Sequence, residues 1–246
     1  MTRILQSLLL VAFLGAAFQV INAQVEVAPG VILMATIQDT NINESSGLIP
    51  SRRGKGAYWT HNDGDDNIFA IDIKGRSLGN WTVGAAPTPV DFEDIAWSPG
   101  RIYAADIGNN DLLRPEVFVF AVPEPGPTFS GSLPNKGRWR LRYPNDERFD
   151  AEAFVIHRRT GYIIGKELVN GNAPVYSFPL RKRGGTFVMT RECELDVDDD
   201  VGGADLTRDG RRLAIITRTG AYLFDLPGAI PTSGELEPSL FVPFAL

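Results

Sequence analysis

The chain has 246 residues, of which 43 % are hydrophobic, and this is enough to bury a substantial core. Its formal net charge of −6 argues against a nucleic-acid partner, because nucleic-acid-binding domains carry basic surfaces. The single cysteine, Cys193, excludes an intrachain disulfide. Packing alone must therefore stabilise the fold.

Residues 1–23 are predicted to be a secretory signal peptide. Arg3 precedes an apolar stretch over 4–20, and Ala23 is a small residue at the expected cleavage site. An uncleaved anchor is the alternative. No later stretch is long enough to cross a bilayer, so we expect a secreted or periplasmic domain over 24–246 with no membrane span. Asn43 and Asn80 begin glycosylation sequons, which matter only in a eukaryotic secretory route.

Four similar units follow one another along the mature chain. Each opens with an acidic or small-residue leader ahead of a short apolar strand, and the leaders begin at Glu44, Glu93, Asp150 and Val201. Three further short strands complete each unit, with glycine-containing turns between the first two strands. A repeat of roughly 50 residues built from four strands is typical of a β-propeller blade.

The strands are predicted in chain order from alternating and aromatic-rich segments. The third strand of each unit is the clearest, because it is rich in aromatic and branched residues. No helical period is found after the signal peptide, so we predict an all-β protein. The predicted strands are 47–50, 57–61, 68–73 and 77–83; 95–97, 101–106, 117–122 and 137–143; 153–157, 162–166, 175–180 and 186–195; 204–207, 213–217, 222–226 and 239–245.

The strand count leaves one strand over. Residues 31–37 form an apolar segment that is predicted to be an outer strand, yet the fourth unit has its own outer strand at 239–245. Either a four-bladed ring closes with one redundant strand, or a fifth unit is missing. We favour an incomplete five-bladed ring, because an unpaired edge exposes backbone donors and acceptors.

Several short runs give the mature chain a resemblance to a known group: 44–48, 58–63, 91–96, 105–110, 150–153, 166–167, 203–206 and 209–210. It resembles exported, mostly uncharacterised bacterial β-propeller proteins, whose members continue with a last unit opening on Gly-Glu-Ala that is absent here. More distantly, the acidic leaders are similar to those of gluconolactonase-type and phytase-type propellers, and this similarity implies a divalent cation in the channel.

The acidic leaders are candidate metal ligands. Glu44, Glu93 and Asp150 occupy equivalent places ahead of the innermost strands, so in a ring their carboxylates would converge at one channel mouth. Asp106 and Glu152 add further oxygen ligands, which Ca²⁺ or another divalent cation prefers. The alternative is that these acids cap turns and pair with arginine or lysine across blades.

His61 and Lys166 are the candidate groups for proton transfer. Both lie at the ends of second strands, where mixed charges also favour an ion-pair network. With only one other histidine in the chain, a multi-histidine metal site is excluded. The acidic run 196–200 is predicted to be a solvated loop, with a weak calcium site as the alternative.

The sequence favours a binding module that takes a small ligand, a cation or an extracellular partner at the acidic channel mouth. A divalent-cation-dependent hydrolase of lactones or phosphoesters is the alternative function, with His61 or Lys166 moving protons. A truncated, inactive product is the third possibility.

Overall fold

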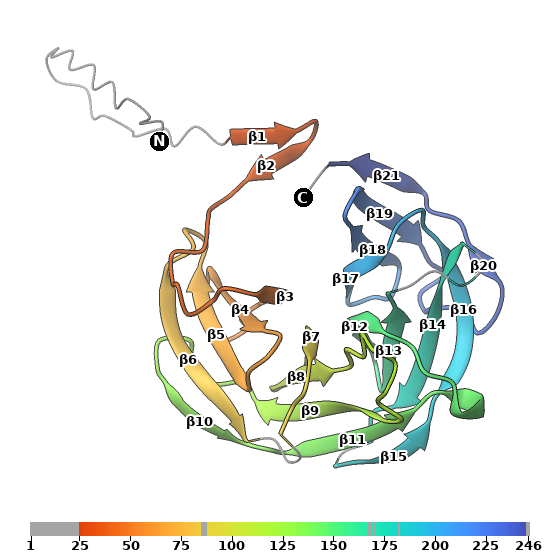
Figure 1. Cartoon of the computed structure of the whole chain (residues 1–246). Helices are drawn as coiled ribbons and strands as arrows, with labels where there is room; N and C mark the ends of the chain where they lie inside the picture. The colour runs from red at the N-terminus through yellow and green to blue at the C-terminus, as the bar shows by residue number, and fades with distance from the viewer. Residues whose placement is uncertain (1–24, 85–87, 167–168, 170, 182, 245–246) are drawn as a thin grey trace, which may run out of the picture.

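The structure is a computed structural model that describes residues 25–84, 88–166, 169, 171–181 and 183–244. The predicted signal peptide lies outside these residues. Four twisted sheets stand around a common axis as the blades of a four-bladed β-propeller, which confirms the predicted all-β propeller and its four blades (Figure 1). The described part contains one 3-10 turn, η1 (Pro144–Asp146), and is otherwise strands and loops.

Each blade runs from an innermost to an outer strand in chain order, and short turns connect its first two antiparallel strands. Blade 1 holds β3 (Ser45–Pro50), β4 (Ala57–Asn62), β5 (Asn67–Asp72) and β6 (Ser77–Gly84); blade 2 holds β7 (Phe92–Ser98), β8 (Arg101–Asp106), β9 (Val117–Pro123) and β11 (Gly137–Arg142); blade 3 holds β12 (Ala151–His157), β13 (Thr160–Gly165), β14 (Asn172–Pro179) and β16 (Thr190–Asp196); blade 4 holds β17 (Val201–Leu206), β18 (Arg212–Thr217), β19 (Gly220–Asp225) and β21 (Leu240–Pro243).

Three blades gain a fifth strand from the blade that follows. β10 (Gly131–Pro134) pairs in parallel with β6, β15 (Gly184–Val188) with β11, and β20 (Glu235–Leu236) with β16. Each added strand comes from the connection between the third and fourth strands of the next blade. The added strands cover the outer edges of blades 1 to 3 and tie neighbouring blades together.

This arrangement corrects one predicted strand. Residues 186–195 were predicted to form a single outer strand of blade 3, but the chain divides there into β15, which pairs with blade 2, and β16, which pairs with blade 3. The division falls at Met189, a buried residue between the two strands. Both halves are extended, so their local pattern could not reveal that they belong to different sheets.

Aromatic side chains fill the spaces between blades. Trp59, Phe92 and Phe120 are buried between blades 1 and 2. Trp139 and Tyr176 are buried between blades 2 and 3, and corresponding residues of blades 3 and 4 form a third cluster. Large rings suit these wedge-shaped spaces because each buries a large apolar area. This packing sets the angle between blades and hence the direction of the central axis.

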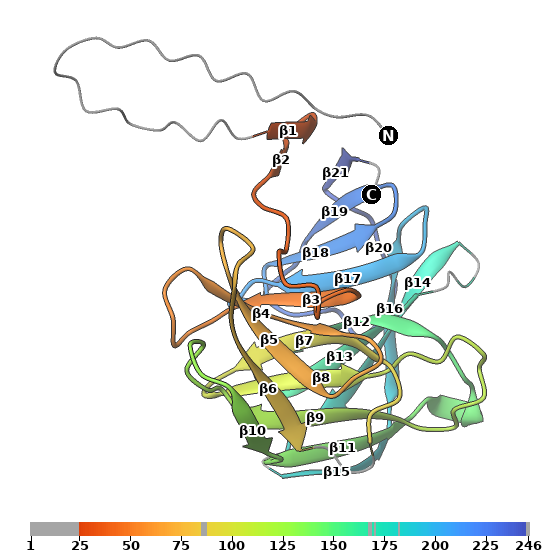
Figure 2. The same cartoon turned by 60° about the vertical axis from the view of Figure 1, so that its left-hand side comes forward.

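The innermost strands contact one another in the order β3, β7, β12 and β17. Within the described part of the chain, β17 and β3 share no contact of comparable extent, and Figure 1 shows the ring open between blades 4 and 1. Figure 2 turns blade 1 towards the viewer. Ile37 and Ile42 pack against Phe69 and Ile71 on blade 1, in the segment that precedes β3.

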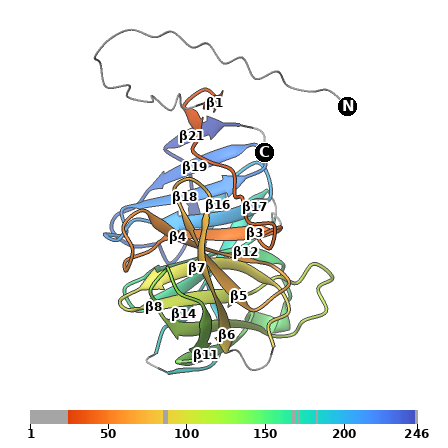
Figure 3. The ribbon, with the colours of Figure 1, turned by 90° about the vertical axis from the view of Figure 1, so that its left-hand side faces the viewer.

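The predicted N-terminal strand over 31–37 is shorter than expected and joins no blade. β2 (Val31–Leu33) pairs instead with β1 (Val25–Ala28) in a two-stranded hairpin that stands away from the ring, as Figure 3 shows. Gly30, at φ +78°, permits the tight turn between the two strands.

Gly184 offers a test of the strand added to blade 2. Its φ is +90°, and a Cβ there would lie 1.8 Å from the carbonyl oxygen of Arg138. Gly234 has a φ of +91° but nothing within 4 Å, so it is a matched control. Gly234→Ala is expected to cost about 1 kcal/mol and Gly184→Ala about 2 kcal/mol, since β15 can detach locally. Thermal melting measures both, and equal losses would contradict the tight approach.

Candidate functional site: an acidic channel mouth

The four innermost strands begin at the same end of the channel, because each runs outward into an equivalent second strand. The pairing register places the start of each innermost strand beside the end of the second strand of the same blade: Phe92 faces Asp106, and Ala151 faces Gly165. Residues before β7 and β12 therefore meet residues that follow β4, β8 and β13. Carboxylates from three blades gather at this mouth.

A β-bulge occurs near the start of every innermost strand. The register shifts between Phe92 and Asp94 in β7, between Ala151 and Ala153 in β12, and at equivalent places in β3 and β17. The extra residues in β7 and β12 are Glu93 and Glu152. Bulges redirect side chains at the rims of sheets, and here they carry two of the predicted ligands.

Glu93 is the most unusual group of the site. The residue is only 4 % exposed, and its carboxylate has no hydrogen-bond partner among the described residues. Burial, together with the nearby charges of Glu152, Asp91 and Asp63, raises its pKa to about 9. The side chain is largely buried and its carboxylate has no donor or counter-ion among the described residues, so a bound cation or proton would stabilise it.

Asp63 and Asp91 complete the acidic cluster and were not among the predicted ligands. Burial and then the charge of Asp91 raise the pKa of Asp63 to about 6, and Asp63 Oδ1 is buried without a partner. Burial and the charge of Asp150 raise the pKa of Asp91. One signal was available, since Asp91 lies only two residues before the predicted ligand Glu93 in the sequence.

Gly108 allows two of these carboxylates to approach each other. A Cβ at this position would lie 2.3 Å from both Asp91 Oδ2 and Glu93 Oε1. Because both oxygens lie so near one point, they are close enough to bind the same cation. Gly108 has no positive φ, so its lack of a side chain serves this close approach rather than a turn.

Lys166 neutralises the far side of the cluster. Its ammonium contacts Asp150 Oδ2 at 3.3 Å and pairs with Glu152. Burial acts to lower the pKa of Lys166, but the bonds to Glu152 and Asp150 outweigh it and raise the pKa. Asp150 also accepts a 2.7 Å hydrogen bond from the Asn109 N–H. The two predicted ligands Asp150 and Glu152 are thus ion-paired.

Asp106 has a positioning role at this mouth. It accepts hydrogen bonds from the N–H groups of Val90 and Asp91 at 3.1 and 2.9 Å, and Arg114 pairs with it at 2.8 Å. These contacts hold the segment that carries Asp91. Glu44 lies exposed at the rim, near enough to contribute to the raised pKa of Asp63.

His61 is fully buried and its ring nitrogens are both engaged. Nε2 accepts a 3.2 Å hydrogen bond from the Gly47 N–H, and Nδ1 donates to the Asn62 carbonyl at 3.1 Å. Burial lowers the pKa of His61 to about 4, and its ring packs edge-on against Phe92. Neither His61 nor the ion-paired Lys166 is placed as a free proton acceptor, which disfavours the hydrolase alternative.

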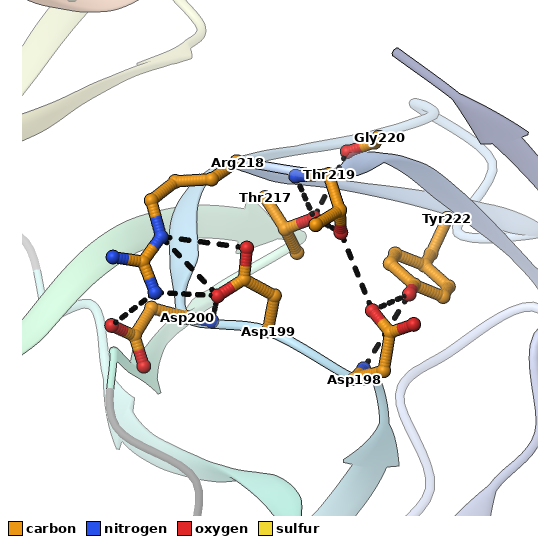
Figure 4. Close-up of polar contacts among 8 residues, drawn as sticks. All are labelled: Asp198, Asp199, Asp200, Thr217, Arg218, Thr219, Gly220 and Tyr222. Carbon is orange, nitrogen blue, oxygen red and sulfur yellow. Dashed lines mark hydrogen bonds and ion pairs between the residues drawn. The ribbon is translucent and has the colours of Figure 1, made fainter. Parts of the chain in front are cut away.

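The acidic run 196–200 leads from the end of β16 in blade 3 to β17 in blade 4, and Figure 4 shows how its charges are paired. Arg218, at the end of the β18–β19 hairpin, pairs with Asp199 at 2.6 Å and Asp200 at 3.2 Å. Asp198 accepts a hydrogen bond from the hydroxyl of Tyr222. These contacts agree with the prediction of a solvated loop and leave only Asp196 outside the network.

Three carboxylates close enough to share one metal ion occur once among the described residues. One group of three carboxylates has ligand atoms within 4.8 Å of one another: Asp196, Glu235 and Glu237, of which the last two are exposed. The channel carboxylates are spaced more widely. A cation at the channel mouth would take at most two carboxylates directly in this conformation, with water completing its shell.

Comparison with known proteins gives no family. No protein-family model and no curated protein match the chain. Solved structures that match include Kuenenia stuttgartiensis hydrazine synthase (11 % identity, TM-score 0.44, covering 94 % of this chain and 53 % of that one), the Neurospora crassa Pan2 WD40 domain (10 %, 0.41, 76 % and 48 %) and a luciferin-regenerating enzyme (10 %, 0.42, 82 % and 61 %).

The chain spans about half the length of the solved structures it matches. At these TM-scores the similarities carry no argument about function, and the fold assignment rests on the sheets themselves. Membership of the exported bacterial group stays a prediction. No helix of the described residues is long and apolar enough to span a membrane.

Proposed function

We propose that the chain is an exported binding module that holds a divalent cation at the acidic channel mouth. The observation that carries this proposal is Glu93, a buried carboxylate with a raised pKa and no partner among the described residues. Its neighbours Asp63 and Asp91 are carboxylates too, and one oxygen of Asp63 is also unpartnered. A bound cation would stabilise all three.

Calcium is the cation that fits best, because it accepts six to eight oxygen ligands in flexible geometry and tolerates water among them. Asp91 and Glu93 would supply the direct ligands, and Asp63 would act through water or after a small movement. Lys166 already pairs with Asp150 and Glu152, so the remaining acids would be the main partners of the cation. We expect weak binding, with a dissociation constant of about 0.1–1 mM.

A calcium titration followed by thermal melting tests the proposal. Binding to the folded state alone at ten times the dissociation constant contributes about 1.4 kcal/mol, which raises the melting temperature by about 3–6 °C. Glu93→Gln and Gly108→Ala should each abolish the rise. The first removes a ligand charge, and the second inserts a methyl group between Asp91 and Glu93 without changing any charge.

The control is Glu235→Gln combined with Glu237→Gln, which disrupts the carboxylate group on blades 3 and 4. This variant should keep the full response to calcium. Loss of the response here, with retention in Glu93→Gln, would place the cation on the surface group and overturn the proposal. No response in the wild-type protein up to 10 mM calcium would overturn it as well.

A further inference from the structure

The opposite end of the channel holds a second site of different chemistry. A cavity of about 410 Å³ lies where the innermost strands end, with lining residues from β3, β7, β12 and β17 and from the turns that follow them. A strand of six residues is about 20 Å long, so the cavity is well separated from the acidic mouth. Its volume falls within the range of small-molecule pockets.

Three arginines line this cavity: Arg52, Arg158 and Arg208. Each stands in the turn after an innermost strand, in blades 1, 3 and 4 respectively, so the repeat itself brings them together around the axis. Asp205 is the one acidic residue of the lining, and its charge interacts with Arg52. The other two arginines have no acidic counterpart among the lining residues.

Arg158 and Arg208 are free to bind an anion. Among the residues that the structure describes, neither guanidinium has a hydrogen bond or an ion pair. Arg158 also has a φ of +54°, which is uncommon for a residue other than glycine and places its side chain at a tight turn. Guanidinium groups bind carboxylate and phosphate oxygens in a bidentate manner.

The walls between the arginines are apolar. Ile49, Ile95 and Ile156 contribute aliphatic surface, and Trp97 contributes an indole ring. The Trp97 Nε1–H donates to buried Glu124 at 2.8 Å, and the guanidinium of Arg52 lies 5.2 Å from the ring centroid. These contacts fix the ring before any ligand enters, which reduces the entropy lost on binding.

We propose that this cavity binds an organic anion: a carboxylate or phosphate ester that carries an apolar group. The anionic end would contact Arg158 and Arg208, and the apolar part would lie against Trp97 and the isoleucines. The site is independent of the proposed cation site, since it uses different residues at the other end of the channel. The two ends of the channel thus carry opposite charge: the mouth is acidic and the cavity is basic.

Fluorescence titration with 1-anilinonaphthalene-8-sulfonate, an apolar anion, tests this proposal in the presence of EDTA. Saturable binding of one probe per chain is expected. The variant Arg158→Gln/Arg208→Gln should weaken binding at least tenfold, because charge-assisted contacts contribute strongly. The neutral analogue N-phenyl-1-naphthylamine lacks the sulfonate, and its weaker binding should be the same in both proteins.

Arg159→Gln/Arg211→Gln is the matched control. It removes the same charge from the same two turns, but neither residue lines the cavity. The control should bind the sulfonate as the wild type does. Equal weakening in both double variants, or parallel loss of the neutral analogue, would overturn the proposal. All three proteins are compared by thermal melting, and these exposed substitutions should leave the melting temperature unchanged.

Displacement of the bound probe distinguishes the two kinds of anion. Displacement by 1-naphthoate supports a carboxylate, and displacement by 1-naphthyl phosphate supports a phosphate ester. The neutral 1-naphthamide should displace the probe at least tenfold less well than the better anion. If neither anion displaces the probe, or if the amide does so equally well, the assignment is wrong.

Discussion

Replacing Glu124 with methionine is expected to lower the free energy of unfolding by about 4 kcal/mol, since hydrogen bonds to a buried charged group contribute about 1.5–3 kcal/mol each. The residue is 3 % exposed and accepts hydrogen bonds from the indole N–H groups of Trp59 and Trp97 at 3.2 and 2.8 Å. It also accepts from the Arg52 N–H at 2.7 Å and the Ser51 hydroxyl at 3.0 Å.

This carboxylate joins blades 1 and 2 at the end opposite the acidic mouth. Burial acts to raise its pKa, but the donors from Arg52, Trp97 and Trp59 outweigh burial and lower it. Methionine conserves volume but leaves Trp59 Nε1 buried without an acceptor. Urea denaturation measures the loss of unfolding free energy. The midpoint urea concentration should fall, and the dependence of the free energy on urea concentration should stay unchanged.

Glu116→Gln is the control for Glu124→Met. Glu116 pairs with Arg140 and Arg142, whose side chains are about half exposed, and such surface pairs contribute less than about 1 kcal/mol. If Glu124→Met costs no more than Glu116→Gln, then the four donors find water instead. In that case the junction between blades 1 and 2 depends on aromatic packing alone.

The pH dependence of stability should reveal the buried Glu93. Its pKa is about 9 in the folded protein and about 4.5 when unfolded, so the folded state holds the proton more tightly. Folding stability therefore carries no penalty from Glu93 below pH 4.5 and falls as the pH rises from 4.5 towards 9. Asp63 and Asp94, with pKa values of about 6 and 8, act in the same direction.

Glu93→Gln removes the contribution of Glu93 to the pH dependence of stability and leaves those of Asp63 and Asp94. In cation-free buffer the variant should be more stable than the wild type by about 3 kcal/mol at pH 7 and by less than about 1 kcal/mol at pH 5. Urea denaturation at both pH values measures the difference. A difference that does not change with pH would show that Glu93 titrates normally and that its carboxylate is hydrated.

The rise in melting temperature with calcium and the pH dependence of stability both depend on the carboxylate of Glu93. At neutral pH the empty site costs stability, and a divalent cation would remove that cost by replacing the proton. Glu93→Gln should thus be more stable than the wild type without calcium, yet calcium should not stabilise it further. This pair of results would distinguish a binding site from a structural role of Glu93, because replacing a structural acid would lower the stability of the protein.

Much of the strand pattern was predictable from sequence because it depends on local chemistry. The third strands, such as β5 and β9, carry aromatic and branched residues that fit a pleated, buried surface. The repeat also placed Glu44, Glu93 and Asp150 near one end of the innermost strands, since equivalent positions in equivalent blades share an end. The prediction of ligands among them is still to be tested.

Other features depended on contacts between distant segments. The exchange of β10, β15 and β20 onto preceding blades has no local signal, because an extended segment can pair with any free edge. The pairing of Lys166 with Asp150 and Glu152 separates spectator acids from the unpartnered Glu93. The sequence alone could not distinguish these acids. The residue type fixes the charge of a side chain, but the counter-ion that neutralises it comes from a distant segment of the chain.

The repeat and the residue types by themselves determined an all-β propeller with acids at one end of its channel. Only the tertiary structure decided which acids are neutralised, through bulges that redirect Glu93 and Glu152 and through the approach that Gly108 allows. It also assembled Arg52, Arg158 and Arg208 around one cavity. The physical reason is that burial and charge pairing are set by neighbours in space, and those neighbours come from different blades.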